Sequence, residues 1–393
     1  MTAPFDSLAA AIRGRTEAML AAIAELVRVN SHTANKAGGD EVGAILARRA
    51  AELGLVVHVR RSDRYADHLA FSTPAAAGSA EGAVVLVGHH DTVFPPGTFE
   101  GFSREGDLAR GPGVLDMKGG IVVMLEALRA LREAGGLARS KVRVVLVGDE
   151  EIGSPEGRPF IVEQTGGAAL ALVFEAGRAA DKIITNRKGT GSAKVVATGR
   201  AAHAANNHKD GVNAIWALAR FVERAQRLTD YGRGVTVNVG TIVGGEAKNT
   251  VPDRCECQLD FRFERIEDAH STFAALRQAC ADAAAEVPGA SLAIDGGPGR
   301  MPLERTPANV ALYEAYAAHA AAVGLGNAEA ALIAGGSDAS TTAAEGIPTI
   351  DGLGPRGSGF HTKDELIEVG SLEPKAHALA RLLWERAGAG AAD

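Results

Sequence analysis

Acidic side chains and histidines gather in five short segments of this sequence, and their types are suited to holding metal ions and moving protons. Three segments directly follow apolar runs: G-H-H-D-T at 88–92, G-D-E-E at 148–151, and Glu175. A fourth, G-P-G-V-L-D-M-K-G-G, spans 111–120, and a fifth, G-F-H, spans 359–361. Several carboxylates meeting at one place repel one another unless they are protonated or neutralised by a cation. These segments therefore favour a divalent metal site.

The mixture of donor types narrows the choice of metal. Imidazole together with carboxylate suits zinc and related transition metals, whereas calcium and magnesium prefer shells made of oxygen alone. A catalytic zinc keeps one position open for water, and two ions ~3.5–4 Å apart act on the same substrate. Taken singly, each segment is more often an ordinary solvated loop than a site. Their joint occurrence is what favours a functional interpretation.

The apolar runs before these segments predict the strands that position them. Runs at 55–59, 83–87, 142–147 and 169–174 are rich in β-branched residues, and a helical pattern at 119–131 separates two of them. Strands that are apolar on both faces and alternate with helices form largely parallel sheets covered by helices on both sides. Ligands of such sheets gather at the carboxyl ends of the strands. We therefore expect the acidic and histidine segments to converge there.

The middle of the chain predicts a separate α+β module. Its order of strand, helix, strand, strand, helix and strand is the split-βαβ or ferredoxin-like motif. These elements are predicted at 193–198, 213–228, 235–243, 256–263, 269–286 and 291–294. Helices outside the module are predicted at 6–29, 309–322 and 372–386. We expect an α/β catalytic domain formed by 1–188 and 303–393, interrupted by an inserted domain at 189–302.

Length, charge and composition argue against several other classes of protein. A chain of 393 residues predicts about two or three domains. The 41 Lys and Arg against 48 Asp and Glu give a net charge of −7, which offers no basic surface for nucleic acid or an anionic membrane. No apolar run reaches the ~18 residues of a membrane span, and charged residues interrupt any secretory signal in the first 25 positions. We expect a cytoplasmic protein whose cysteines, Cys255, Cys257 and Cys280, are buried thiols.

Taken in order, the five segments resemble the M20 family of dinuclear zinc peptidases and amidohydrolases, and within it the glutamate carboxypeptidases of the carboxypeptidase G type. The strings that carry the resemblance are G-H-H-D-T-V, G-P-G-V-L-D-M-K-G-G, G-D-E-E-I-G-S, V-F-E-A and G-S-G-F-H-T. The likeness covers nearly the whole chain, including the inserted module, which in this family is a lid and dimerisation domain. It implies two divalent ions, with zinc favoured over cobalt or manganese, and a homodimer formed through 189–302.

The resemblance also assigns metal ligands. His89 and Glu175 resemble the ligands of one ion, and Glu151 and His361 resemble the ligands of the other. Asp116 resembles the carboxylate that bridges both ions, and the family usually has a cis peptide bond after it. The resemblance therefore supplies a complete set of five ligands.

Two further acids resemble catalytic residues of the family. Asp91 resembles the acid that orients His89, and Glu150 resembles the general base. The resemblance implies that Glu150 takes a proton from the water that attacks the amide carbonyl and later protonates the departing nitrogen. His90 and Asp149 have no inherited role, and we expect Asp149 to be a solvated neighbour.

Four residues of the inserted module resemble groups that bind substrate. His203, in G-R-A-A-H-A, resembles a histidine that reaches across the dimer to stabilise the tetrahedral oxyanion. Asn249, in A-K-N-T-V-P, and Arg262, in D-F-R-F, resemble residues that hold the substrate carboxylate, a task that suits the planar guanidinium. Arg300, in P-G-R-M-P, resembles another arginine near the site. A strand-edge ion pair is the alternative for Arg262, and a hinge ion pair is the alternative for Arg300.

The resemblance implies hydrolysis of an amide bond next to a free α-carboxylate, in an N-acyl amino acid, a dipeptide or a folate-like glutamyl amide. The strings R-K-G at 187–189 and N-N-H at 206–208 depart from the carboxypeptidase G pattern, so a glutamate preference is not implied. A deacetylase or desuccinylase of amino-acid biosynthesis is the alternative enzyme. A non-catalytic metal-binding or ligand-binding homologue is the alternative from another class, but such a module has no need of the base Glu150.

Overall fold

The computed structural model describes residues 3–389, and the chain forms two compact units. The first unit comprises Met1–Asn186, Arg305–Ile333 and Ser337–Asp393, and the second comprises Arg187–Glu304 and Ala334–Gly336. Each unit has a hydrophobic core of its own. None of the helices between residues 3 and 389 has the length and apolar character needed to span a bilayer.

A six-stranded sheet forms the centre of the first unit. Its strands, in spatial order, are β1 (Val56–Arg60), β2 (His68–Ser72), β6 (Val142–Val147), β3 (Val84–His89), β7 (Leu170–Val173) and β14 (Thr349–Ile350). The last four run parallel, whereas β1 and β2 are antiparallel to their neighbours. Every residue of β2, β3, β6 and β7 is buried, as expected for strands covered on both faces. The predicted mainly parallel sheet is confirmed.

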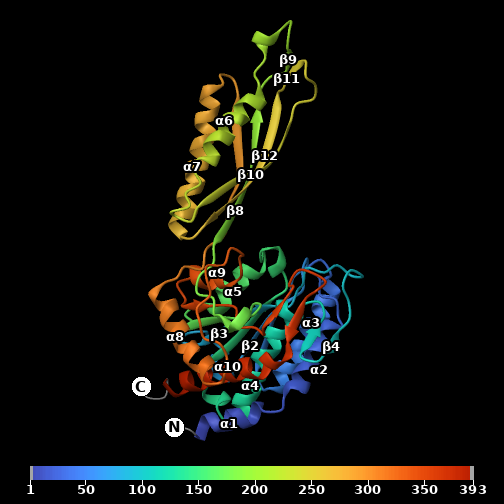
Figure 1. The fold of residues 1–393 in the computed structure, drawn as a ribbon, viewed down its shortest axis with the longest axis vertical. Helices are drawn as coiled ribbons and strands as arrows, with labels where there is room; N and C mark the ends of the chain where they lie inside the picture. Colours follow the sequence, from blue (N-terminus) through green and yellow to red (C-terminus); the bar gives the residue numbers. More distant parts are fainter. Residues whose placement is uncertain (1–2, 390–393) are drawn as a thin grey trace. The chain divides into compact units, whose positions relative to one another are not determined.

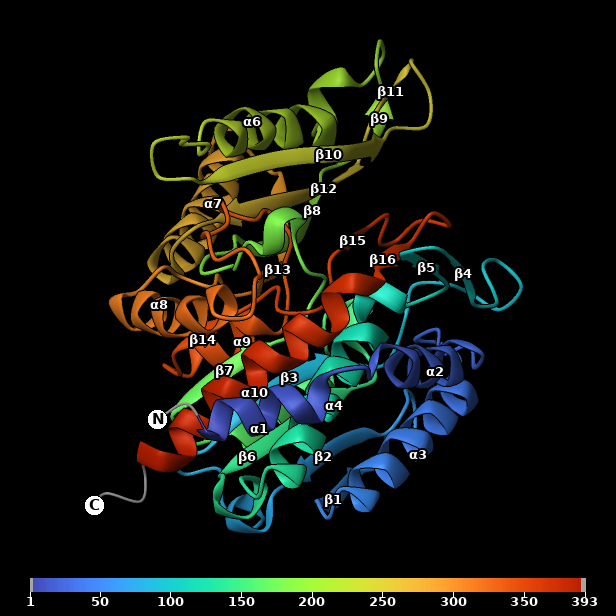
Figure 2. The ribbon, with the colours of Figure 1, turned by 60° about the horizontal axis from the view of Figure 1, so that its bottom comes forward.

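Helices cover both faces of this sheet. The helices are α1 (Ala3–Ile12), α2 (Thr16–Val27), α3 (Lys36–Glu52), α4 (Gly119–Glu133), α5 (Gly157–Thr165), α8 (Pro307–Ala321), α9 (Ala339–Ala344) and α10 (Leu372–Ala389). Helices α1, α4 and α10 pack on one another over one face (Figure 2). Helices α5 and α9 pack together and contact strands β6 and β7. The single helix predicted at 6–29 is wrong, because Gly14 adopts a left-handed φ of 77° and separates α1 from α2.

A second, small sheet brings two predicted metal-site loops together. It consists of β15 (Gly357–Ser358), β16 (Leu366–Glu368), β5 (Leu108–Arg110) and β4 (Ser103–Glu105), all antiparallel. Strands β15 and β16 flank the loop that carries His361, and β5 leads into the loop that carries Asp116. The pairing of β16 with β5 therefore aligns two loops that lie some 250 residues apart in the sequence.

The second unit has the predicted βαββαβ order. Its elements are β8 (Gly189–Thr198), α6 (Ala214–Gln226), β10 (Thr236–Gly244), β12 (Arg254–Phe263), α7 (Ile266–Glu286) and β13 (Ser291–Arg300). The four strands form an antiparallel sheet in the order β10, β12, β8, β13. Helices α6 and α7 lie side by side against this sheet (Figure 1). The core of the second unit contains Cys255, Cys257 and Cys280, whose predicted burial as free thiols is confirmed.

Candidate metal centre

Residues from three neighbouring strands of the first unit meet at the carboxyl edge of the sheet. His89 is the last residue of β3, Glu150 and Glu151 follow β6 in a single turn of helix, and Glu175 follows β7. Because β6, β3 and β7 are adjacent and parallel, their carboxyl ends open to the same side. The expected convergence of these segments is confirmed.

Asp116 lies at the centre of the cluster. Its Oδ1 atom lies 3.2 Å from Nε2 of His89, and its Oδ2 atom lies 3.2 Å from Nε2 of His361. The same nitrogen of His361 lies 3.1 Å from Oε2 of Glu151, and Nε2 of His89 lies 3.8 Å from Oε1 of Glu175. The two oxygens of Asp116 thus face two different histidines, each of which has a second carboxylate beside it.

The spacing of the donor atoms is suitable for metal ions. The ligand atoms of His89, Glu150 and Glu175 lie within 4.8 Å of one another, and so do those of His89, Asp116 and Glu151. Imidazole and carboxylate donors gathered at this distance are the ligand types that zinc-like ions take. This set of side chains fits a divalent metal centre.

The electrostatics of the cluster support the same conclusion. Burial and the nearby charge of Asp116 raise the pKa of Glu175 to about 7. Hydrogen bonds to Asp116 and Glu151 raise the pKa of His361 to about 10. Burial alone would raise the pKa of Asp116, but hydrogen bonds from His361 and His89 hold it well below its usual range. The protein alone thus balances its carboxylates with protons, which bound divalent cations would replace.

Asp91 connects His89 to the turn that carries the two glutamates. Its carboxylate accepts the backbone N–H groups of Glu150 at 3.1 Å and Glu151 at 3.3 Å, and the hydroxyl of Thr33 at 2.7 Å. Its Oδ1 atom also lies 3.3 Å from Nδ1 of His89. Burial would raise the pKa of Asp91, but the hydrogen bonds from His89 and Thr33 keep it below its ordinary value. One carboxylate therefore orients both the histidine and the glutamate turn.

Glu365, which no sequence motif singled out, holds the loop of Asp116. This buried carboxylate accepts the backbone N–H groups of Gly113 at 3.0 Å, Leu115 at 2.8 Å and Asp116 at 3.0 Å. The peptide bond between Asp116 and Met117 is cis, as the resemblance implied. The one local signal for Glu365 is its position four residues after His361, because its partners are backbone groups about 250 positions away.

Two neighbours of the predicted ligands are buried. The expectation that Asp149 is solvated is wrong: Asp149 is fully buried, and its Oδ2 atom accepts the N–H groups of Glu156 at 2.8 Å and Gly157 at 3.0 Å. These contacts anchor the start of α5, and burial raises the pKa of Asp149 to about 6. His90 is also fully buried, with Nε2 3.1 Å from the carbonyl oxygen of Asp67, and burial lowers its pKa to about 4.

His203 and Asn249 lie in adjoining segments of the second unit. His203 belongs to β9 (Ala202–His203), which pairs with β11 (Thr250–Val251), and Ala204 donates its N–H to the carbonyl oxygen of Asn249 at 2.9 Å. The Nδ1 atom of His203 accepts backbone N–H groups from Ala205 and Asn206, each at 3.2 Å. In the neutral ring, Nε2 therefore carries the proton.

Arg262 and Arg300 flank one residue of β8. Both lie directly opposite Thr190, Arg262 on β12 and Arg300 on β13, so their side chains lie toward the same face of the sheet. The guanidinium of Arg262 forms a two-point ion pair with Asp260, with Nε–Oδ1 2.8 Å and Nη2–Oδ2 3.0 Å. An ion pair is therefore present, as the alternative for Arg262 supposed, but β12 is an inner strand of its sheet and not an edge strand. The stem of Arg300 packs against Gly336, where a Cβ atom would come within 2.9 Å of its Cδ.

Comparisons with known proteins place this chain in a family. Carboxypeptidase G2 of Pseudomonas sp. (strain RS-16) is 28% identical over 376 residues, covering 94% of this chain and 89% of that protein. The acetylornithine deacetylase of Myxococcus xanthus is 33% identical over 202 residues, covering 47% of this chain and 51% of that protein. The structure of aminopeptidase PepT from Bacillus cereus ATCC 10987 matches with a TM-score of 0.79 at 23% identity, covering 95% of this chain and 99% of that one. The profile of peptidase family M20/M25/M40 matches residues 85–385, so this chain belongs to that family and is a metal-dependent hydrolase.

Proposed function

We propose that this protein is a dinuclear metallohydrolase that cleaves an amide bond next to a free α-carboxylate. The observation that supports this most is the position of Asp116, whose two oxygens lie 3.2 Å from His89 and 3.2 Å from His361. A carboxylate with this placement is suited to bridging two ions. His89 and Glu175 would complete the ligands of one ion, and Glu151 and His361 those of the other.

Bound divalent ions would polarise the amide carbonyl and make water a better nucleophile near neutral pH. Zinc is favoured, with cobalt or manganese as alternatives, because imidazole and carboxylate suit these ions. The cysteines do not compete as nucleophiles, since all three are buried in the second unit and burial raises the pKa of Cys257 to about 11 and of Cys280 to about 12. We propose water as the attacking group.

Glu150 is the proposed general base. Its backbone N–H is held by Asp91 at 3.1 Å, and its carboxylate lies within 4.8 Å of the ligand atoms of His89 and Glu175. In this position it would take the proton from the attacking water and pass it to the departing nitrogen. Asp91 orients His89 and the Glu150–Glu151 turn.

Recognition of the substrate is assigned to the second unit. The Nε2–H of His203 is available as a donor for the oxyanion, because Nδ1 is already an acceptor of two backbone N–H groups. Arg262, Arg300 and Asn249 are the proposed partners of the substrate carboxylate. We propose an N-acyl amino acid or a short peptide as substrate. The alternative is removal of an acetyl or a succinyl group, the activities for which two relatives are named, a deacetylase and a desuccinylase.

A homodimer through the second unit is also proposed. Strand β10 is one of the two edge strands of its sheet, and the side chains of Ile242 and Val243 are 55% and 68% exposed. On α6, Trp216 is 55% exposed. An edge strand with exposed apolar side chains favours pairing with another chain. We propose a second copy of this chain as that partner.

Substitution of the proposed base tests the function. With zinc, cobalt or manganese supplied, the wild-type protein should hydrolyse N-acyl amino acids or dipeptides in a screen that varies both halves of the substrate. Glu150→Gln should lower kcat by about 10²–10⁴-fold, while about two ions per chain are still bound. Full turnover by this variant would remove the base assignment. Two bound ions without hydrolysis of any substrate would instead support the non-catalytic homologue.

A further inference from the structure

A hollow lined by cations lies in the first unit, at the opposite edge of the sheet from the metal cluster. Arg139 and Lys141 reach it from the segment before β6, and Arg386 reaches it from α10. Its cavity volume is about 240 Å³, and Val84 at the start of β3 also lines it. Strands β3 and β6 each have six residues, or roughly 20 Å at ~3.3 Å per residue. The hollow is therefore separate from the metal centre, which stands at the other ends of these strands.

The charges of this hollow are of one sign. None of its lining residues is acidic. Within residues 3–389, Arg139, Lys141 and Arg386 take part in no ion pair with a carboxylate, although acids outnumber bases in the chain by 48 to 41. Three cations that share one concavity repel one another, and an anion placed among them relieves this repulsion.

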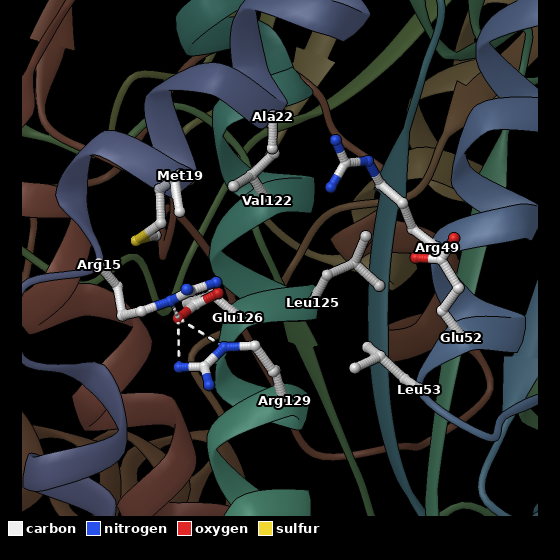
Figure 3. Close-up of a pocket in the computed structure, with 11 residues that line it drawn as sticks. Arg15, Met19, Ala22, Arg49, Glu52, Leu53, Val122, Leu125, Glu126 and Arg129 are labelled. Atoms are coloured by element: carbon white, nitrogen blue, oxygen red, sulfur yellow. Dashed lines mark hydrogen bonds and ion pairs between the residues drawn. The ribbon is translucent and has the colours of Figure 1, made fainter.

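A second hollow of the same unit provides a contrast. It lies between α2, α3 and α4 and is lined by three arginines as well, but Glu126 and Glu52 stand among them (Figure 3). Glu126 pairs with Arg15 at 3.1 Å and with Arg129 at 2.6 Å, as the dashed lines show. The arginines of that hollow are neutralised within the protein, whereas the cations of the first hollow are not.

The segment that carries two of these cations, Arg139 and Lys141, is held by several contacts. The guanidinium of Arg139 stacks over the ring of Trp384, 4.0 Å from its centroid. Gly136 makes room for this ring, because a Cβ atom there would lie 2.7 Å from it. The hydroxyl of the buried Ser140 donates to the carbonyl oxygen of Gly136 at 2.9 Å, and the carbonyl oxygen of Lys141 accepts the N–H of Val84 at 3.0 Å. The backbone that carries Arg139 and Lys141 is thus fixed on both sides.

We propose that this hollow binds a small multivalent oxyanion, independently of the hydrolytic site. A single exposed ion pair contributes little, so the arrangement favours an anion that engages all three cations at once. Guanidinium and ammonium groups both bind phosphate and carboxylate oxygens. The volume lies below the ~300–1,000 Å³ of pockets for drug-sized ligands, which limits the ligand to a small anion. Phosphate and polycarboxylate groups share this chemistry.

Calorimetric titration of the full-length, metal-loaded protein tests the proposal. The probes are pyrophosphate and the tricarboxylate tricarballylate, at constant ionic strength. The triple variant R139Q, K141Q, R386Q should weaken binding of the preferred probe by about tenfold or more, which corresponds to ~1.4 kcal/mol. Binding of either probe at the metal centre is common to both proteins, so the difference isolates the hollow. The probe with the larger difference identifies the phosphate or the carboxylate source.

A matched control removes the same charge elsewhere. The triple variant R13Q, R28Q, R277Q changes three exposed cations outside the hollow, and Arg277 also stacks on an aromatic ring, that of Phe273. It should bind the probes within about twofold of wild type. Equal losses in both triple variants, or no loss in the hollow variant, would overturn the proposal. If the hollow variant does not fold, K141Q alone should still weaken binding about threefold, and unchanged binding by K141Q would count against the site.

Discussion

At the scale of single residues, the metal centre depends on buried polar groups behind the ligands. Asp91, Asp149 and Glu365 are each at most 1% exposed, and each accepts at least two backbone N–H groups. Carboxylates in such positions fix loops that ordinary side-chain packing would leave mobile. The loops of the metal centre are therefore held by residues outside the proposed set of ligands.

The clearest prediction at this scale concerns Glu365. Glu365→Gln keeps one oxygen and replaces the other with an NH₂ group. Either the N–H of Gly113 or the N–H groups of Leu115 and Asp116 then lose their acceptor, so the loop should be held less firmly. We expect metal affinity or kcat to fall by about 10–100-fold while the protein stays folded. Metal titration and steady-state kinetics measure this. The exposed neighbour provides the control Asp364→Asn, which should behave as wild type, and equal values for E365Q and wild type would contradict the role of Glu365.

A second prediction concerns pH and His68. This buried ring accepts the N–H of Gly148 at 3.3 Å and stacks on Phe160. Burial lowers its pKa below the ordinary 6.5, so below about pH 6.5 the unfolded chain binds a proton before the folded chain does. His68 therefore makes the free energy of unfolding fall as pH drops, by at most about 1.4 kcal/mol per pH unit.

Denaturant unfolding between pH 7 and pH 5 checks this effect. His68→Gln should show a shallower decline of the unfolding free energy than wild type. His58, which is exposed and also stacks on Phe160, provides the control. His58→Gln should keep the wild-type slope. A wild-type slope in the His68 variant would show that another histidine is responsible.

At the scale of elements, sequence patterns predicted the strands and helices with strong periodicity and missed those without it. Strand β6 at 142–147 was predicted with its observed bounds, because every residue of this run except Arg143 is apolar. Helix α3 was missed because its apolar residues show little helical periodicity. Three of its buried positions are glycines, Gly38, Gly39 and Gly43. Strand β2 was also missed, because it is short and contains a buried histidine, His68. Its place in the sheet depends on pairing with β6, which no local pattern shows.

The edge strand of the second unit supports a prediction about assembly. If β10 pairs with a second copy of this chain, a charge on its exposed apolar side chains should prevent the contact. Val243→Lys should shift the dimer toward monomer in analytical ultracentrifugation. Tyr231, which is 85% exposed outside β10, offers the control Tyr231→Lys, which should keep the wild-type mass. A monomeric wild-type protein would contradict the proposed homodimer.

At the scale of the whole molecule, the two separate cores predict two unfolding events. All five proposed metal ligands belong to the first unit, so metal binding should stabilise that unit alone. An ion at a thousand times its Kd contributes ~4 kcal/mol, or a shift in Tm on the order of 10 °C. Chelation with EDTA should therefore lower one thermal transition and leave the other unchanged.

The two tryptophans allow each transition to be assigned. Trp384 belongs to the first unit and Trp216 to the second, and the chain has no others. In Trp216→Phe, the remaining fluorescence should report a transition that EDTA lowers. In Trp384→Phe, it should report one that EDTA does not move. A shift of both transitions by the same amount would show that the proposed ligands do not confine metal binding to the first unit.

The sequence by itself determined the type of sheet, the βαββαβ module and the positions of the acids and histidines at strand ends, because these features depend on local periodicity. Only the tertiary structure decided that the two oxygens of Asp116 face different histidines and that Glu365 holds its loop. It also decided that Asp149 is buried. The contacts of Asp116 and Glu365 join segments that are far apart in the chain. The burial of Asp149 depends on how the rest of the protein packs around its polar segment. Local spacing carries no information about which distant backbone group will face a given carboxylate.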